Sequence, residues 1–197
     1  MEARIRYDAG AAECLVFTYK EGLLSPVAHD LEIRVGSFEI YIDMHDGAAA
    51  GVEATFDAAS LRVRCAMRDG REAPGVLSAR DAGKIEENLR SDEVLDVRRH
   101  PTIRFRSTEI ARGAAGPPTR VRGLLHLHGR EREVAFPVEE RPGPGGRAVA
   151  VAEVRLHQPD FGIKPYSAML GTLKIKPDVL VRLTVPLPAT VAAPPPR

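Results

Sequence analysis

Apolar and polar residues alternate with a period of two along most of this chain, and this pattern limits its fold more than any other feature. In the segment LEIRV, Leu31, Ile33 and Val35 share one parity, whereas Glu32 and Arg34 have the other. Side chains of a β-strand point alternately to opposite faces, so each such run predicts a strand with one buried face. Roughly eight or nine runs of this kind follow one another, joined by short connections or by loops rich in Gly and Pro. The chain is therefore expected to be all-β, with antiparallel neighbours.

The parity of the apolar residues changes at Gly36. Before this glycine the apolar positions are odd-numbered, and after it Phe38 and Ile40 continue the pattern on even numbers. One extra residue turns every later side chain to the other face of a sheet, so a bulge or sharp bend that curves the sheet is predicted at Gly36. A second change of the same kind separates Phe56 from Leu61.

One segment, from Ser78 to Asp96, has helical periodicity instead. Ser78 and Asp81 fit a capping box, and Ile85 and Leu89 lie on a narrow apolar stripe. A single short helix cannot supply the repeated crossovers of a parallel sheet, so it is expected to pack against one end of a barrel. The strand pattern is compatible with a closed barrel or a sandwich, and closure has the advantage of removing exposed strand edges. The interior of an eight-stranded barrel either fills with side chains or holds one narrow ligand, and the pattern leaves both open.

Charge and cysteine content narrow the class of protein. The 28 basic and 27 acidic residues give a formal net charge of +1, which provides no long-range field to attract nucleic acid or an anionic membrane. Cys14 and Cys65 are too few for a secreted disulfide framework and are expected to be small buried hydrophobes.

The two ends of the chain carry further expectations. The segment MEARIRYDAG lacks the apolar run of a signal peptide, and nothing in the sequence approaches a membrane span of about 20 apolar residues. We therefore expect a soluble, cytoplasmic protein. Residues 1–187 are expected to form one barrel domain, and residues 188–197 a Pro-rich disordered tail.

Four segments extend this reading, in the order GLLSPVAHDLEIRVGSF, LRSDEVLDVRRHPTIRFRSTEI, VRGLLHLHGREREVAFPVE and HQPDFGIKPYSAMLGTLKIKPDVLVRLTV. Together they resemble the YceI-like family of lipid- and polyisoprenoid-binding proteins, and the resemblance covers nearly the whole chain. The chain departs from the family pattern in four places. Val94-Leu95 stands where phenylalanine is usual, His100 stands where tyrosine is usual, and Leu124 and His126 replace a polar pair. These departures bear on the identity of the ligand more than on the fold.

The resemblance implies a single lipocalin-like antiparallel β-barrel of about eight strands with one short helix insertion. It also implies a non-catalytic protein that binds or carries a polyisoprenoid or similar amphiphilic lipid in the barrel interior, with no cofactor and no metal. The partner would be this small apolar or amphiphilic molecule, and the oligomeric state stays open, with a homodimer as one candidate. A packed-core barrel that acts as a stress-related or protein-interaction accessory, without a bound lipid, is the alternative. The candidate ligand-binding residues of the tunnel are chosen by alternation, and those of the mouth by their position in a loop. They are Phe17, Phe38, Phe56, Phe105 and Phe136 in the tunnel, Phe161 and Tyr166 at the mouth, and His29 as a contact for the head group.

Two pairs of residues, His29-Asp30 and His126 with His128, are candidates for catalysis or metal binding. His29 and Asp30 are adjacent on a predicted strand, so their side chains point apart and Asp30 cannot orient the imidazole for catalysis. A structural role at the start of the strand is therefore favoured over a head-group contact. His126 and His128 share a face, but spacing supplies no third or fourth ligand for a metal, so no metal site and no catalytic residue are predicted.

Overall fold

The computed structural model describes residues 2–21, 29–112, 118–168 and 173–187; the predicted tail, residues 188–197, lies outside these ranges. Twelve strands form one sheet of antiparallel pairs in the order β1-β5-β6-β9-β10-β11-β12-β15-β2-β4-β7-β8. A small second sheet has the order β13-β14-β3. The strands are β1 (Glu2–Asp8), β2 (Glu13–Thr18), β3 (Lys20–Glu21), β4 (Asp30–Val35), β5 (Phe38–His45), β6 (Ala48–Asp57), β7 (Leu61–Arg68), β8 (Arg71–Ala73), β9 (Thr102–Arg112), β10 (Pro118–Leu127), β11 (Arg130–Pro142), β12 (Ala148–His157), β13 (Ser167–Ala168), β14 (Leu173–Ile175) and β15 (Asp178–Pro186).

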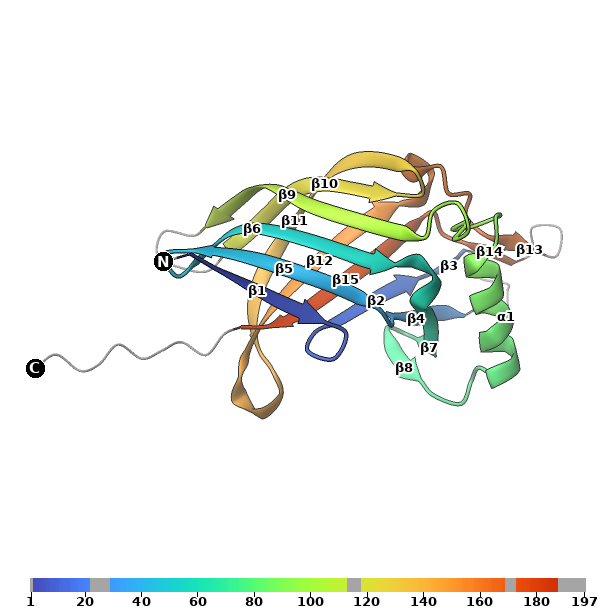
Figure 1. Ribbon diagram of the computed structural model, residues 1–197. Helices are drawn as coiled ribbons and strands as arrows, with labels where there is room; N and C mark the ends of the chain where they lie inside the picture. The colour runs from blue at the N-terminus through green and yellow to red at the C-terminus, as the bar shows by residue number, and fades with distance from the viewer. Residues whose placement is uncertain (1, 22–28, 113–117, 169–172, 188–197) are drawn as a thin grey trace, which may run out of the picture.

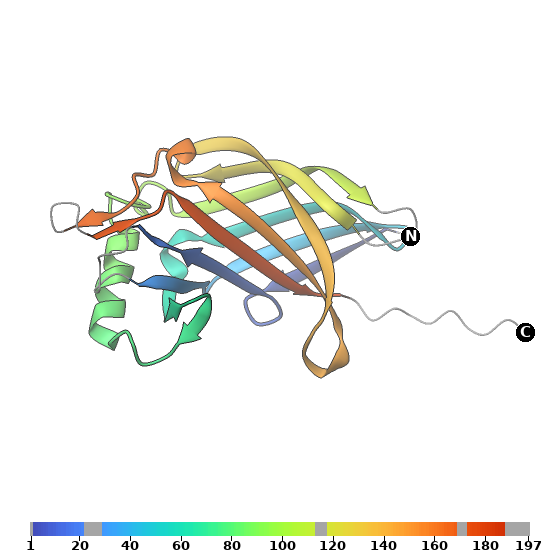
Figure 2. The same cartoon turned by 180° about the vertical axis from the view of Figure 1, so that it is seen from behind.

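The larger sheet is strongly curled (Figures 1 and 2). Apolar side chains from most of its strands line the inside of the curl. The prediction of an all-β chain with one helix is confirmed. The prediction of an eight-stranded closed barrel is wrong, because the described sheet has twelve strands and ends at β1 and β8. The sheet has more strands than predicted for two reasons. One long stretch of chain is split by a bend into β4 and β5, and another into β6 and β7. In addition, β1 and β8 extend the two ends of the sheet.

The predicted bend at Gly36 is confirmed, and it is coupled to the bend between β6 and β7. The Gly36 amide donates to the Ser60 carbonyl at 3.0 Å, the Ser37 amide donates to Ser60 Oγ at 3.0 Å, and the Asp57 amide donates to the Ser37 carbonyl at 3.0 Å. A Cβ on residue 36 would lie 3.0 Å from the Ser60 carbonyl oxygen, so glycine suits this close approach. The 3-10 turn η1 (Ala58–Ser60) forms the corner.

The helix α1 (Ala79–Arg90) closes one end of the curled sheet (Figure 1). As predicted, Ser78 caps it: the Asp81 amide donates to Ser78 Oγ at 3.1 Å. The helix is shorter than predicted, because it ends at Arg90 and turns follow. The Val63 amide donates to Glu86 Oε1 at 3.0 Å, which ties α1 to β7. Within the described residues, no helix has the length and apolar character that a membrane crossing requires.

Candidate functional site: the cavity inside the curled sheet

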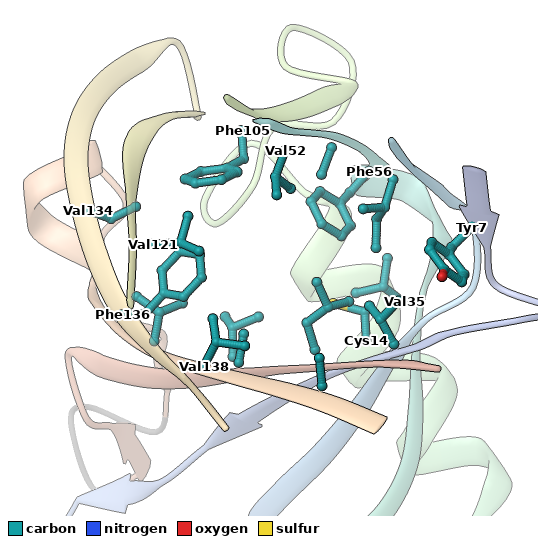
Figure 3. A pocket seen from close by; sticks show the side chains of 18 of the residues that line it. Tyr7, Cys14, Val35, Val52, Phe56, Phe105, Val121, Val134, Phe136 and Val138 are labelled. Atoms are coloured by element: carbon teal, nitrogen blue, oxygen red, sulfur yellow. The ribbon is translucent and has the colours of Figure 1, made fainter. Parts of the chain in front are cut away.

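The curled sheet encloses a cavity of about 940 Å³. This volume lies at the upper end of the range of about 300–1,000 Å³ that is usual for small-molecule sites. Alternate side chains of nearly every strand point into it, and most of them are aliphatic or aromatic (Figure 3). Examples from around the wall are Ile5, Cys14, Ile33, Val35, Ile40, Val52, Ala54, Phe56, Phe105, Val121, Val134, Phe136, Val138, Ala152, Val181 and Val185.

The two ends of the cavity differ in exposure. The end beneath α1 is formed by side chains that are buried or half-buried, including Leu89, Val94 and Ile163. The opposite end, at the β5–β6 turn and the tips of β9, β11 and β12, includes the exposed residues Arg112 and Arg147. The cavity therefore has an apolar inner end under the helix and a mouth that reaches solvent where charged side chains stand.

Three of the predicted tunnel residues line the cavity: Phe56, Phe105 and Phe136. The rings of Phe105 and Phe136 contact each other, with their centroids 5.5 Å apart. Phe38 is 5 % exposed and packs against Phe56 at a centroid distance of 5.7 Å, outside the cavity lining.

Phe17 lies on the other face of β2, and its predicted position in the tunnel is wrong. The cavity-facing residues of this strand are Cys14, Val16 and Thr18, so alternation turns Phe17 outward. There the Arg182 guanidinium lies 4.9 Å from the centre of the Phe17 ring. Apolar residues occupy both parities of this strand, so the sequence alone did not decide which face Phe17 takes.

The two predicted mouth residues lie at the opposite end from the mouth. Phe161 is 2 % exposed in the 3-10 turn η3 (Gln158–Phe161), and the Tyr166 hydroxyl accepts a hydrogen bond from Asn88 of α1 at 3.0 Å. Neither lines the cavity. Both belong to the layer that covers the inner end. Val94 and Leu95, which stand where phenylalanine was expected, do line it.

The His29-Asp30 pair has the structural role that was favoured, as far as Asp30 is concerned. Asp30 Oδ1 accepts a hydrogen bond from the Lys20 amide at 2.8 Å and so joins the start of β3 to the start of β4. His29 is half-buried and does not line the cavity. Whether His29 or any other predicted residue contacts a ligand stays a prediction.

The other histidines also pack in structural roles. His128 Nδ1 donates to the Phe161 carbonyl at 3.2 Å, and the His128 ring lies 4.6 Å from that of His100. In the part of the chain that the structure describes, no group of three or more His, Cys, Asp or Glu side chains is placed to hold a metal ion.

The residues that line the cavity include polar ones that the sequence did not single out as ligand contacts, among them Tyr7, Cys14, Thr18 and Gln158. Burial raises the pKa of Tyr7, and burial raises the pKa of Cys14 to about 12. Thr18 is 9 % exposed, and its hydroxyl has no hydrogen-bond partner among the described residues. The alternation of Cys14, Val16 and Thr18 along β2 was the available signal for Cys14 and Thr18, but Leu15 and Phe17 make the other parity equally apolar.

Comparison with protein families matches residues 9–187 to the YceI-like domain. The chain belongs to the YceI-like family. Comparison with curated proteins finds no significant match. This family membership confirms the resemblance that the four sequence segments carried.

Several solved structures have the same fold. BcnA of Burkholderia cenocepacia is 17 % identical, with a TM-score of 0.60, over 89 % of this chain and 96 % of that one. A polyisoprenoid-binding domain from Saccharophagus degradans, implicated in plant cell wall breakdown, is 12 % identical, with a TM-score of 0.58, over 94 % and 97 % of the two chains. The YceI protein of Campylobacter jejuni is 10 % identical, with a TM-score of 0.57, over 85 % and 90 %. At these identities the likeness concerns the fold alone.

Proposed function

We propose that this YceI-like protein binds a polyisoprenoid or similar amphiphilic lipid in its cavity, without catalysing a reaction. The observation that carries the proposal is the cavity itself, about 940 Å³ and walled almost entirely by apolar side chains. Such a space suits an extended hydrocarbon chain. The Saccharophagus degradans domain of the same fold, described as polyisoprenoid-binding, gives independent support.

Apolar burial would drive the binding. Each CH₂ group removed from water contributes about 0.8 kcal/mol, so affinity should rise steeply with chain length until the cavity is full. At the mouth, Arg112, Glu140 and Arg147 stand where the chain would meet solvent. A near-neutral net charge of +1 also favours a lipid partner over nucleic acid. A cytoplasmic location is part of the same proposal.

The chemistry of the wall supports binding without catalysis. Cys14 is the thiol that faces the cavity, and a pKa of about 12 keeps it protonated at neutral pH, when it is a poor nucleophile. The alternative, a barrel with a packed core and no lipid, is disfavoured by an interior that side chains do not fill.

Isothermal titration calorimetry with geraniol, farnesol and geranylgeraniol, on protein freed of lipid by unfolding and refolding, tests the proposal. We expect affinity to increase with chain length and the heat capacity change of binding to be negative, the robust marker of apolar burial. A variant that fills the cavity, Ala152→Phe, should weaken binding, because Ala152 lines the cavity and pairs with Leu183 in the middle of β15.

The matched control is Arg155→Phe, which adds the same ring to the exposed face of the same strand. It should bind as the unmodified protein does. Absence of binding by the unmodified protein, or equal binding by Ala152→Phe, would contradict the proposal.

A further inference from the structure

The cavity inside the curled sheet is long and is covered at one end. Its lining runs along β12 from Ala148 to Leu156, a length of about 26 Å at about 3.3 Å per residue. The helix α1 closes the inner end (Figure 1), and the exposed Arg112 stands at the mouth. A lipid chain that enters at the mouth therefore lies lengthwise and ends against the side chains that close the inner end.

Two buried side chains stand at this inner end. Val94 lies in the turns that follow α1 and is 5 % exposed, and Ile163 follows the 3-10 turn η3 and is 4 % exposed. Both line the cavity and belong to the main hydrophobic core, whereas Leu89 and Leu95, which also line this end, are half-buried. We call Val94 and Ile163 the floor of the cavity.

Backbone hydrogen bonds hold the floor in place. The Val94 amide donates to the Ser91 carbonyl at 3.3 Å, and the Asp96 amide donates to the same carbonyl at 2.7 Å. The Ile163 amide donates to the Gln158 carbonyl at 3.1 Å. The floor side chains are thus fixed both by their own backbone and by close packing in the core, which resists displacement.

The size of two opposing effects decides whether a longer chain can push the floor aside. Each CH₂ group that enters the cavity strengthens binding about fourfold. Forcing one more group into a well-packed core costs the equivalent of roughly five- to hundredfold in an equilibrium constant. Because the cost exceeds the gain, a chain that already touches the floor gains no affinity when it is lengthened, and its extra groups stay outside the mouth.

We propose that Val94 and Ile163 set the longest chain that the cavity accepts, and so select among lipids by chain length. This inference rests on the proposed function and deepens it. The floor is aliphatic, so the apolar end of the ligand faces it and the polar head stays towards the mouth. Affinity for straight-chain amphiphiles then rises with length and stops rising at one defined length, the break.

The test measures the affinities of saturated straight-chain alcohols that differ by one carbon atom, by competition with a fluorescent fatty alcohol on protein freed of lipid. Val94→Ala removes two methyl groups and should move the break to a longer chain. An alcohol one CH₂ group longer than the original break should bind this variant about fourfold more tightly than the alcohol at the break does.

Two conservative variants keep the test informative if Val94→Ala is too unstable to assay. Ile163→Val removes one carbon atom from the floor and should also move the break to a longer chain. Val94→Ile adds one carbon atom and should move it to a shorter chain. Opposite shifts from substitutions at one end of the cavity identify that end as the stop.

Two control variants make the same change as Val94→Ala elsewhere. Val121 of β10 points into the cavity from the side wall (Figure 3) and is 4 % exposed, so Val121→Ala widens the cavity without lengthening it and should leave the break in place. Val76 is 39 % exposed and lies outside the lining, so Val76→Ala should leave every affinity unchanged.

An unchanged break in both Val94→Ala and Ile163→Val would overturn the inference while leaving the proposed function intact. An equal shift in Val121→Ala would also overturn it, because total volume rather than the floor would then set the length. If no alcohol binds the unmodified protein at any chain length, the proposed function fails, and this inference fails with it.

Discussion

Replacing Gly123 by alanine should be costly, because a Cβ at this position would clash with the neighbouring strand β9. Gly123 is a buried residue of β10 at a register shift against β9, opposite Ser107. A Cβ at this position would lie 2.4 Å from the Arg106 carbonyl oxygen and 2.6 and 2.7 Å from two ring atoms of Phe105. Real Cβ atoms do not approach that closely, so both the backbone of β9 and the Phe105 ring must move.

The magnitude follows from overpacking. Forcing an extra methyl group into a filled site costs about 1–3 kcal/mol of unfolding free energy. For a protein of this size each kcal/mol lowers the Tm by about 2–4 °C, so Gly123→Ala should lose roughly 2–12 °C. The displaced Phe105 ring lines the cavity and contacts Phe136, so ligand affinity should fall as well.

Gly83→Ala is the control for this experiment. Gly83 lies within α1, and a Cβ there would meet no atom within 4 Å. Alanine is the better helix former by about 0.8–1.0 kcal/mol, so this variant should be slightly more stable than the unmodified protein. Thermal and denaturant unfolding of both variants is the assay. Equal stability of Gly123→Ala and the unmodified protein would refute the packing argument.

Three further predictions concern the outer layer and the thiols. Burial raises the pKa of Glu32, which is 4 % exposed and paired with Arg64 at 2.7 Å, so the folded protein binds a proton here that the unfolded chain releases. Relative to Glu32→Gln, the unmodified protein should therefore lose stability as the pH rises from about 4.5 towards neutrality. A difference in unfolding free energy between the two proteins that does not vary with pH would contradict this. Asp30→Ala should lower the unfolding free energy by about 1–2 kcal/mol, because the Lys20 amide loses its acceptor. Asp30→Asn keeps an oxygen at this position and should lower the unfolding free energy less. The reverse order of the two variants would be inconsistent with the observed hydrogen bond. The folded Cys65→Ser variant, whose remaining thiol is Cys14, should react very little with Ellman's reagent at pH 8, because Cys14 is buried and burial raises its pKa to about 12. Fast reaction of this variant before unfolding would show that Cys14 is accessible.

The sequence predicted those parts of the fold that depend on local periodicity. Alternation placed Ile40, Ala54 and Phe105 on the inner face, and the parity change at Gly36 predicted the bend, because one residue of offset reverses every later side chain. The capping pattern at Ser78 likewise predicted the start of the helix correctly.

Long-range pairing was beyond what periodicity can predict. The parity changes indicated where each stretch bends, but not that the two bends meet, because the hydrogen bond from the Gly36 amide to the Ser60 carbonyl joins residues that are distant in sequence. Phe17 was misplaced because a buried aromatic residue on the outer face has the same composition signal as one on the inner face. Its cover, Arg182, comes from the other end of the chain.

The sequence predicted the apolar character of the candidate site but only some of the residues that line it. Alternation predicted the apolar lining at Phe56, Phe105 and Phe136. It did not predict that Thr18 is buried or that its hydroxyl has no partner among the described residues, because both depend on how distant strands pack.

Native mass spectrometry of the protein purified from its own host tests the central claim most directly. We predict a complex whose added mass is that of an apolar chain, released on unfolding and greatly reduced in Ala152→Phe but not in Arg155→Phe. A clean ligand-free mass for the unmodified protein, together with no thermal shift on adding prenyl alcohols, would contradict the account.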